Sequence, residues 1–184
     1  MFTNDHNKLI VITTCIDLNL FKPKNISHNN DNFILGYVGS VSLWYKFEET
    51  LIFFKFLLKK LPDSLLYIFN LNDHDYIKFM ISKHDVPTKN ILLKRGDNFD
   101  IAKSMQNMKA GVFFINNYYS KIASSPTKLG EFLASGVPCV TNTGIGDASN
   151  LLYNNQVGVV IDNFDEQTLE KAVNQIITLT KEDN

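Results

Sequence analysis

Residues 124–138 have the sequence Ser124-Ser125-Pro126-Thr127-Lys128-Leu129-Gly130-Glu131-Phe132-Leu133-Ala134-Ser135-Gly136-Val137-Pro138. This stretch predicts a helix with a signal at each end. Ser125 is of a residue type that caps helix starts, and Pro126 suits the first helical position, where its missing N–H group is not needed. Gly136 suits the left-handed residue that follows a helix, and Pro138 cannot continue one.

Polar side chains lie in or near the first turn of this predicted helix. A helix start carries free N–H groups and a partial positive charge, so Ser125, Thr127 and Lys128 could hold a phosphate there. Glu131, one turn further on, could accept hydrogen bonds from two hydroxyls, such as those of a ribose. The alternative is an ordinary capped helix whose Lys and Glu side chains are only solvated.

The helix is part of a regular alternation of strands and helices. Apolar runs predict strands at residues 33–39, 65–71, 91–96, 111–115, 138–142 and 157–161. Further helices are expected at 47–61, 73–84, 97–108, 146–153 and 165–177, with Asp73, Asp97 or Asn98, and Asp165 as caps. Continuous apolar strands are typical of a parallel sheet that is covered on both faces. We therefore expect one doubly wound, Rossmann-like α/β domain with a mainly parallel six-stranded sheet and ligands at the carboxyl ends of its strands.

The chain start is expected to lie outside this domain, which we place at residues 25–184. Within residues 1–24, the polar start at 1–8 is expected to be disordered. Residues 9–13 form a short apolar run typical of a strand, and the remainder is expected to be a connecting loop. Residues 25–32 are polar and predict a loop as well.

Bulk composition narrows the classes of function. The 184 residues are 45% apolar and 20% charged, with a net charge of -1, which does not indicate a nucleic-acid-binding surface. Cys15 and Cys139 have no metal-binding or disulfide spacing, and the four histidines form no ligand pair. No targeting segment or membrane-spanning apolar run is visible, so we expect a cytoplasmic protein.

Residues 124–138 resemble the nucleotide-sugar motif of the retaining glycosyltransferases of family four, also called group 1. Members of that family have two Rossmann-like domains that face each other across a cleft, which is the B-type fold. The resemblance implies that this chain is the C-terminal, nucleotide-sugar-binding domain. It also implies that the helix start holds the donor diphosphate and that Glu131 holds the ribose.

Other segments extend the resemblance and show where it departs from the family. Many members carry a second Glu eight residues before the ribose-binding one, and Ala123 occupies that position here, so this contact is not carried over. Gly144-Ile145-Gly146-Asp147 matches a subgroup that has Ser-Pro-Thr-Lys in the loop and Gly-Asp after the next strand. Residues 14–23 resemble the segment that joins the two domains, so an acceptor-binding N-terminal domain is expected upstream and is missing here.

The loop after the strand at 33–39 could approach the same ligand. Gly39 lets the backbone come close to a ligand, or it simply makes a tight strand-to-helix turn. Many family members have an Arg directly after this Gly and a Lys five residues further on, both of which reach the diphosphate. Ser40 and Tyr45 occupy those positions here. The resemblance therefore carries over Gly39 and, one residue late, Lys46, with Lys128 as a further source of positive charge.

Several side chains in neighbouring loops are candidates for base or sugar contacts. Trp44, together with the adjacent Tyr45, could stack on a base or sugar or could cover the domain edge. Arg95 could stack on the base or remain solvated, and Lys121 could add charge near the phosphates. Asp147 could contact the sugar or cap the next helix. The sequence assigns no catalytic residue.

The resemblance predicts the donor-binding half of a retaining glycosyltransferase, which moves a sugar from a nucleotide diphosphate sugar to an acceptor hydroxyl without a metal or other cofactor. Surface polysaccharide or glycolipid synthesis is the background expectation, with the full enzyme associated peripherally with the inner face of the membrane. Two alternatives stay open. One is a nucleotide-sugar epimerase, which shares the fold but needs acid/base groups in the cleft. The other is a non-catalytic nucleotide-binding module, which Ala123 and the missing domain favour.

Overall fold

The computed structural model describes residues 14–24 and 32–182. The expected disordered start at 1–8, the strand-like run at 9–13 and most of the loop at 25–32 lie outside the described residues. The strands are β1 (Ile34–Val38), β2 (Leu65–Phe69), β3 (Ile91–Lys94), β4 (Ala110–Val112), β5 (Cys139–Asn142) and β6 (Gly158–Ile161). The α-helices are α1 (Phe47–Lys60), α2 (His74–Lys83), α3 (Asn98–Met105), α4 (Thr127–Ala134), α5 (Ala148–Asn155) and α6 (Glu166–Glu182), and 3₁₀ turns lie at η2 (Thr88–Asn90) and η3 (Tyr119–Lys121).

The strands form one six-stranded sheet in the order β3-β2-β1-β4-β5-β6. Every pair of neighbouring named strands is parallel. The order reverses direction between β1 and β4, which is the topological switch point of a doubly wound sheet. The expected Rossmann-like fold is thus confirmed, and its predicted ligand crevice lies where the loops after β1 and β4 separate.

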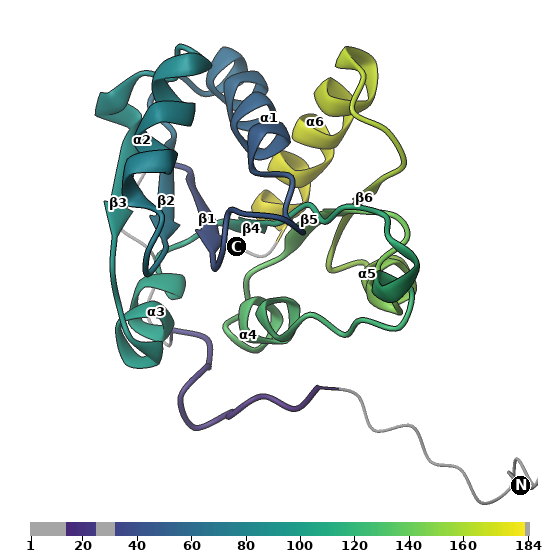
Figure 1. Ribbon diagram of the computed structural model, residues 1–184. Coiled ribbons are helices and arrows are strands. Elements are labelled where there is room, and N and C mark those ends of the chain that lie inside the picture. The colour runs from purple at the N-terminus through teal and green to yellow at the C-terminus, as the bar shows by residue number, and fades with distance from the viewer. Residues whose placement is uncertain (1–13, 25–31, 183–184) are drawn as a thin grey trace, which may run out of the picture.

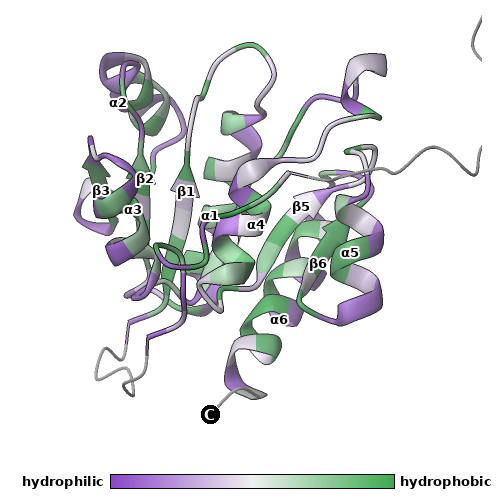
Figure 2. Cartoon of the chain, turned by 90° about the horizontal axis from the view of Figure 1, so that it is seen from below, coloured by the Kyte–Doolittle hydropathy of each residue, from purple (hydrophilic) through white to green (hydrophobic). Residues whose placement is uncertain are grey.

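Helices cover both faces of the sheet (Figure 1). One apolar core lies between the sheet and α1, α2 and α6, and a second lies between the sheet and α3, α4 and α5. Large aromatic side chains such as Phe53, Phe54 and Phe114 fill the first core, and Phe113 and Phe132 fill the second. Figure 2 shows that α5 is amphipathic. Its hydrophobic residues lie toward β6, and its hydrophilic residues lie on its outer side.

The capping predictions have mixed outcomes. Asp97 caps α3, because its Oδ1 accepts hydrogen bonds from the N–H groups of Phe99 and Asp100, both at 2.9 Å. Asp165 accepts a bond from the Thr168 N–H group at the start of α6. Asp73 precedes α2 but makes no side-chain cap bond, so that prediction is wrong.

The described part of the chain start packs against the second helical layer. Thr14 Oγ1 donates a hydrogen bond to the Ser125 carbonyl, and Phe21 is buried in the second core. Further along, Lys24 Nζ donates to Asn107 Oδ1 just after α3. Residues 14–24 therefore run beneath α3 and α4 (Figure 1). Their function as a linker between two domains stays a prediction.

Candidate functional site

The candidate site lies around the start of α4, at the carboxyl edge of the sheet. The helix begins at Thr127, with Pro126 in the capping position and no side-chain cap bond. The prediction that Ser125 caps this helix and that Pro126 is its first residue is therefore wrong. Pro126 has an extended ψ of 117°, so the helix starts one residue later than its sequence signals indicate. The Ser125 carbonyl is held by Thr14, and its hydroxyl is one residue too far back to cap.

The other end of α4 agrees with the prediction. Gly136 has a φ of +74°, the left-handed conformation expected after a helix. The N–H group of Val137 donates to the Phe132 carbonyl at 2.9 Å, and that of Gly136 donates to Leu133 at 3.0 Å. These two bonds form a Schellman motif, which fixes the end of the helix.

Lys128 lies inside the protein although it is a lysine in the first turn of a helix. The side chain is only 8% exposed, and its Nζ atom has no hydrogen-bond partner. Aromatic rings surround the amine, with the ring centre of Tyr45 at 3.9 Å, that of Tyr37 at 5.6 Å and that of Phe113 at 6.0 Å. A Cβ atom built on Gly39 would lie 2.8 Å from Nζ. The structure thus brings together two of the predicted phosphate-binding residues, Gly39 and Lys128.

Burial determines the electrostatics of this part of the site. It lowers the pKa of Lys128 to about 7, against an opposing contribution from Glu131 that favours the charged amine. It also raises the pKa of the half-buried Glu131, while the charge of Lys128 acts in the opposite direction. The two side chains influence each other without forming an ion pair, so each keeps hydrogen-bonding capacity for a ligand.

The backbone at Gly39 is fixed by its neighbours. Gly39 has a φ of +117°, which a residue with a side chain rarely adopts. Its N–H group donates to the Phe69 carbonyl, and its own carbonyl accepts a bond from the Asn70 side chain at 3.0 Å. Tyr37 donates its hydroxyl to the Ser40 carbonyl at 2.6 Å. These hydrogen bonds fix the tight turn at Gly39 in the position that brings it close to Lys128.

A cavity of about 820 Å³ adjoins this loop at the ends of β1, β2 and β3. Its lining includes Gly39, Ser40, Phe69, Gly96 and the exposed Phe99. The volume lies within the range of small-molecule sites in proteins. A base attached to a diphosphate at the start of α4 could therefore extend into it.

Arg95 lies elsewhere. It is exposed and lines a separate hollow of about 450 Å³, together with Lys94, Asp100 and Lys103. The structure does not place Arg95 beside Gly39 or Lys128. Its stacking on a base stays a prediction.

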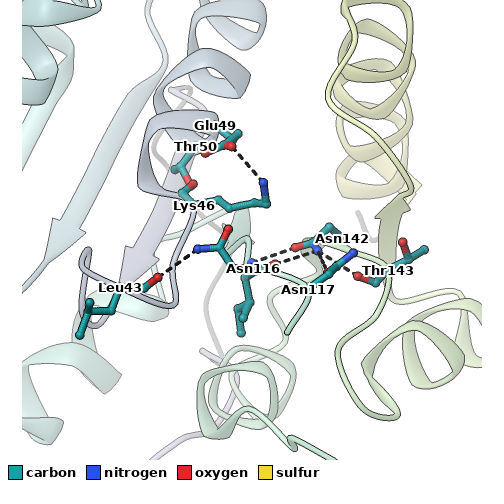
Figure 3. A network of polar contacts seen from close by, with 9 residues as sticks. Leu43, Lys46, Glu49, Thr50, Asn116, Asn117, Asn142 and Thr143 are labelled. Atoms are coloured by element: carbon teal, nitrogen blue, oxygen red, sulfur yellow. Dashed lines mark hydrogen bonds and ion pairs between the residues drawn. The ribbon is translucent and has the colours of Figure 1, made fainter. Parts of the chain in front are cut away.

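A polar network holds the ends of β4 and β5 together (Figure 3). Asn142 is 2% exposed and exchanges two hydrogen bonds with the backbone of Ile115, at 2.8 and 3.0 Å. Its amide nitrogen also donates to Asn117 Oδ1 and the Thr143 carbonyl. This network fixes the start of the loop that leads from β4 to η3 and α4.

Lys46 is held by the chain after β4, and its amine, unlike that of Lys128, has partners within the protein. Its Nζ donates to Glu49 Oε1 at 3.1 Å, as Figure 3 shows, and lies 4.9 Å from the ring centre of Phe164. Its backbone N–H group donates to the Phe114 carbonyl. The amine thus has partners within the protein, and a contact of Lys46 with phosphate stays a prediction.

Trp44, which is exposed, and Lys121, which is partly buried, lie together beside the site. Trp44 is 45% exposed and packs edge-on against Tyr118, with ring centres 5.4 Å apart. Lys121 Nζ lies 4.8 Å from the centre of the Trp44 ring. Tyr45, in contrast, turns its ring toward Lys128. Of the two aromatic residues predicted to stack on a ligand or cover the edge, only Trp44 is substantially exposed.

The Gly144–Asp147 loop packs against the loop that precedes α4. The Gly146 N–H group donates to the Lys121 carbonyl at 3.0 Å. A Cβ atom on Gly146 would lie 1.8 Å from the Ser124 carbonyl oxygen, so a larger residue does not fit. Asp147 is exposed and makes no side-chain cap bond to α5. The alternative role as a cap is therefore absent, and a sugar contact by Asp147 stays a prediction.

Within residues 14–24 and 32–182, no group of three His, Cys, Asp or Glu side chains could hold a metal ion. The expectation of a reaction without metal stays a prediction. Over the same described ranges, no helix is both long enough and apolar enough to cross a membrane.

Comparison with known proteins assigns the family. Residues 20–184 match the model of the glycosyl transferases group 1 family. The chain belongs to this family. The resemblance of residues 124–138 to group 1 glycosyltransferases is thereby confirmed. A comparison with curated proteins finds no match.

Solved structures of group 1 and other glycosyltransferases have the same fold. The C-terminal domain of LpcC, a glycosyl transferase group 1 family protein from Francisella tularensis, has a TM-score of 0.68 at 14% identity, and the alignment covers 90% of this chain and 91% of that domain. A glycosyltransferase from Rickettsia africae has a TM-score of 0.66 at 16% identity, with 96% of this chain and 50% of that one covered. A TarM variant from S. aureus, solved in complex with UDP and two other ligands, has a TM-score of 0.58 at 18% identity, covering 87% of this chain and 34% of TarM. The group 1 chain described here thus spans a third to a half of the longer enzymes.

The sequence did not identify Asn70 and Asn142 as residues that shape this group 1 site, nor the contact of Tyr45 with Lys128. Asn70 and Asn142 are buried. Asn70 holds the loops after β1 and β2, and Asn142 holds the loops after β4 and β5. Tyr45 provides the ring nearest to Lys128. A signal for the two asparagines exists, since each is a polar residue at the carboxyl end of an apolar strand. The contact of Tyr45 with Lys128 had no such signal, because it depends on the fold.

Proposed function

We propose that this chain is the donor-binding half of a retaining glycosyltransferase that uses a nucleotide diphosphate sugar. The observation that carries the proposal is the buried amine of Lys128, which has no hydrogen-bond partner and lies against Gly39 at the start of α4. A buried amine is stable as a cation only when it is paired, and a diphosphate supplies the matching charge. The free N–H groups of the first helical turn add donors directed at the same anion.

Each of the remaining site residues has a role in this proposal. Glu131, half-buried one turn after Lys128, accepts hydrogen bonds from the ribose hydroxyls. The base occupies the cavity beside Gly39, at the ends of β1 to β3. Lys46, Lys121, Arg95 and Asp147 are secondary candidates at the edge of the site.

The chemistry follows from where negative charge develops. When the bond between the sugar and the diphosphate breaks, the leaving diphosphate gains charge. Prearranged N–H groups and a cation stabilise that charge without reorganising during the reaction. The chain therefore lowers the barrier through electrostatic stabilisation of the leaving group, and the proposal needs no metal.

Relatives of similar fold support the type of ligand. TarM was solved with UDP, and a pneumococcal O-GlcNAc transferase with a TM-score of 0.55 was solved with UDP and GlcNAc. WaaG, with a TM-score of 0.63, is described as involved in lipopolysaccharide biosynthesis. We extend these ligands to our chain as a class, namely nucleotide diphosphate sugars, and keep surface polysaccharide or glycolipid synthesis as the setting.

An upstream acceptor-binding domain completes the proposal. Transfer needs donor and acceptor held together, and much of the rate comes from that positioning. We place residues 1–24 at the junction of the two domains and residues 25–184 in the donor-binding one. We place the full enzyme in the cytoplasm, peripherally attached to the inner face of the membrane.

The test combines binding with turnover. UDP and UDP-GlcNAc should raise the melting temperature of the 184-residue chain, since a ligand stabilises the folded state that binds it. The chain alone should transfer no sugar, and fusion to the acceptor domain of a parent enzyme should restore transfer. Transfer without the second domain would contradict the half-enzyme proposal, and binding without transfer by the complete protein would favour the non-catalytic module. Interconversion of UDP-sugars by that complete protein would favour the epimerase.

A further inference from the structure

The buried end of Lys128 raises the question of its charge in the empty site. Aromatic faces from three segments surround Nζ, with Tyr37 on β1, Tyr45 in the loop before α1 and Phe113 after β4. A ring face attracts a cation, but it cannot accept the hydrogen bonds that an ammonium group loses on leaving water. The protein therefore encloses this amine without offering it the partners that a permanent buried charge requires.

The titratable groups around Lys128 do not provide a full counter-charge. Burial raises the pKa of Tyr37 and of Tyr45, so both phenols are neutral at physiological pH. Glu131, on the same helix, is the carboxylate that acts on Lys128. Asp73 acts on Tyr37 instead and is hydrogen-bonded to Asn70.

Desolvation outweighs this single partner. It lowers the pKa of Lys128 from 10.5 to about 7, in spite of Glu131. At pH 8 most of the empty protein therefore carries an uncharged amine at this position. A diphosphate placed at the start of α4 would lie beside Nζ and would favour the ammonium form.

We propose that Lys128 takes up a proton from solvent when the donor diphosphate binds, so that the site carries its cation only when the anion is present. This inference rests on the proposed function, because it needs the diphosphate at the start of α4. The step converts the neutral amine and one proton into an ammonium group, and no bond of the donor changes. The site thus avoids an unpaired buried charge while it is empty.

The first test needs no ligand. The lysine ε-carbon signals of the free, isotopically labelled chain are followed by NMR from pH 5 to 11, and Lys128→Met assigns the signal by its loss. We expect the Lys128 signal to titrate near pH 7, far below the other lysines. Titration near 10.5 would overturn the inference, whatever the protein binds.

The second test counts protons on binding. UDP-GlcNAc is a suitable probe because its diphosphate is esterified at both ends and does not titrate near neutral pH. Calorimetry at pH 8 in two buffers of different ionisation enthalpy should show substantial uptake of protons per ligand, and much less at pH 6, from a free-site pKa of about 7. Above pH 7 the affinity should fall, approaching tenfold per pH unit.

Variants separate this inference from the proposed function. Lys128→Met should bind more weakly and show no proton uptake, whereas Lys171→Met, on the exposed side of α6, should match the original chain. Binding without uptake by the original chain would overturn the proton coupling and leave the donor site standing. Failure of UDP-GlcNAc and GDP-mannose to bind at pH 6 would instead contradict the donor site.

Discussion

Lys46 and Lys128 both lie at a helix start at the carboxyl edge of the sheet, yet their surroundings differ. Lys46, before α1, is partly exposed, bonded to Glu49 and stacked on Phe164. Lys128, in the first turn of α4, is 8% exposed and has no hydrogen-bond partner. The amine of Lys46 thus has partners inside the protein. An amine without them is available to a ligand.

The comparison also accounts for the departure of this chain from its family. Where many members have a Lys five residues after the Arg that follows the Gly of this loop, this chain has Tyr45, whose ring lies 3.9 Å from Lys128 Nζ. We propose that Lys128, at the start of α4, supplies the positive charge that this Lys provides in those members. The ring of Tyr45 is one of the three aromatic rings that surround the Lys128 amine.

The largest expected difference between Lys128 and Lys46 is in their effect on stability. Lys128→Met removes a buried amine that lacks a partner, and it should raise the free energy of unfolding at pH 6 by about 1–4 kcal/mol. Lys46→Met removes a partly exposed pair and should not stabilise the protein. Urea denaturation of both variants checks the difference, and equal effects would break the comparison.

The pH dependence follows from the same residue. The pKa of Lys128 is about 7 in the folded protein, and the ordinary lysine value of 10.5 applies to the unfolded chain. Between these values the unfolded chain binds the proton and the folded chain does not. The free energy of unfolding should therefore rise with pH across this window, by up to about 1.4 kcal/mol per unit. In Lys128→Met that contribution should be absent, so a variant with the same pH profile as the original would contradict the assignment.

Ligand binding should separate the two lysines next. Lys128→Ala should weaken binding of UDP by up to about 3 kcal/mol, the upper range for a charge-assisted hydrogen bond, and should change binding of uridine much less. Lys46→Ala removes a secondary candidate whose amine is already paired with Glu49, so it should weaken binding of UDP much less than Lys128→Ala does. Calorimetry at pH 6 measures all four. Equal losses for UDP and uridine in Lys128→Ala would indicate a packing role.

Glu131 gives a smaller effect of the same kind. Glu131→Gln keeps the shape of the side chain but loses the negative charge, and should cost about 1.5 kcal/mol in UDP binding if the carboxylate accepts ribose hydroxyl bonds. The 2′-deoxy nucleotide should lose less affinity in this variant than the ribonucleotide does. An unchanged affinity in the folded variant would remove Glu131 from the site.

The smallest expected effect is that of replacing Glu49, the ion-pair partner of Lys46. Glu49→Ala breaks the ion pair with Lys46 and should cost about 0.5 kcal/mol of stability or less, as a partly exposed helical pair does. UDP affinity should not change. A marked gain in UDP affinity would show that Glu49 had been holding a phosphate-binding lysine back.

The sequence predicted the fold well because the fold depends on local patterns. Continuous apolar runs predicted all six strands, and Gly136, Asp97 and Asp165 correctly marked ends of helices. The failure at Ser125 involves a tertiary contact, whereas the failure at Asp73 involves a local one. Thr14 binds the Ser125 carbonyl from 111 positions away, and Asn70 supplies the hydrogen bonds to the turn before α2.

The types of residue in the site could be predicted from the sequence, but their surroundings in the fold could be predicted much less well. A Lys and a Glu in the first turns of a helix indicated an anion and a hydroxyl ligand, and the structure places Lys128 against Gly39 as well. The burial of Lys128 depends on rings from β1, the loop before α1 and the chain after β4. No local sequence pattern indicates that aromatic rings from three distant segments surround one side chain.

The contact between Gly146 and the Ser124 carbonyl has a consequence for how this site could change over generations. The two loops meet through backbone atoms, so their fit does not depend on the neighbouring side chains at Ile122, Ala123 and Asp147, all of which are exposed. We expect these positions to tolerate wide substitution while the scaffold persists. In a randomised library selected for folded protein, many residues should survive at 122, 123 and 147, and Gly alone at 146.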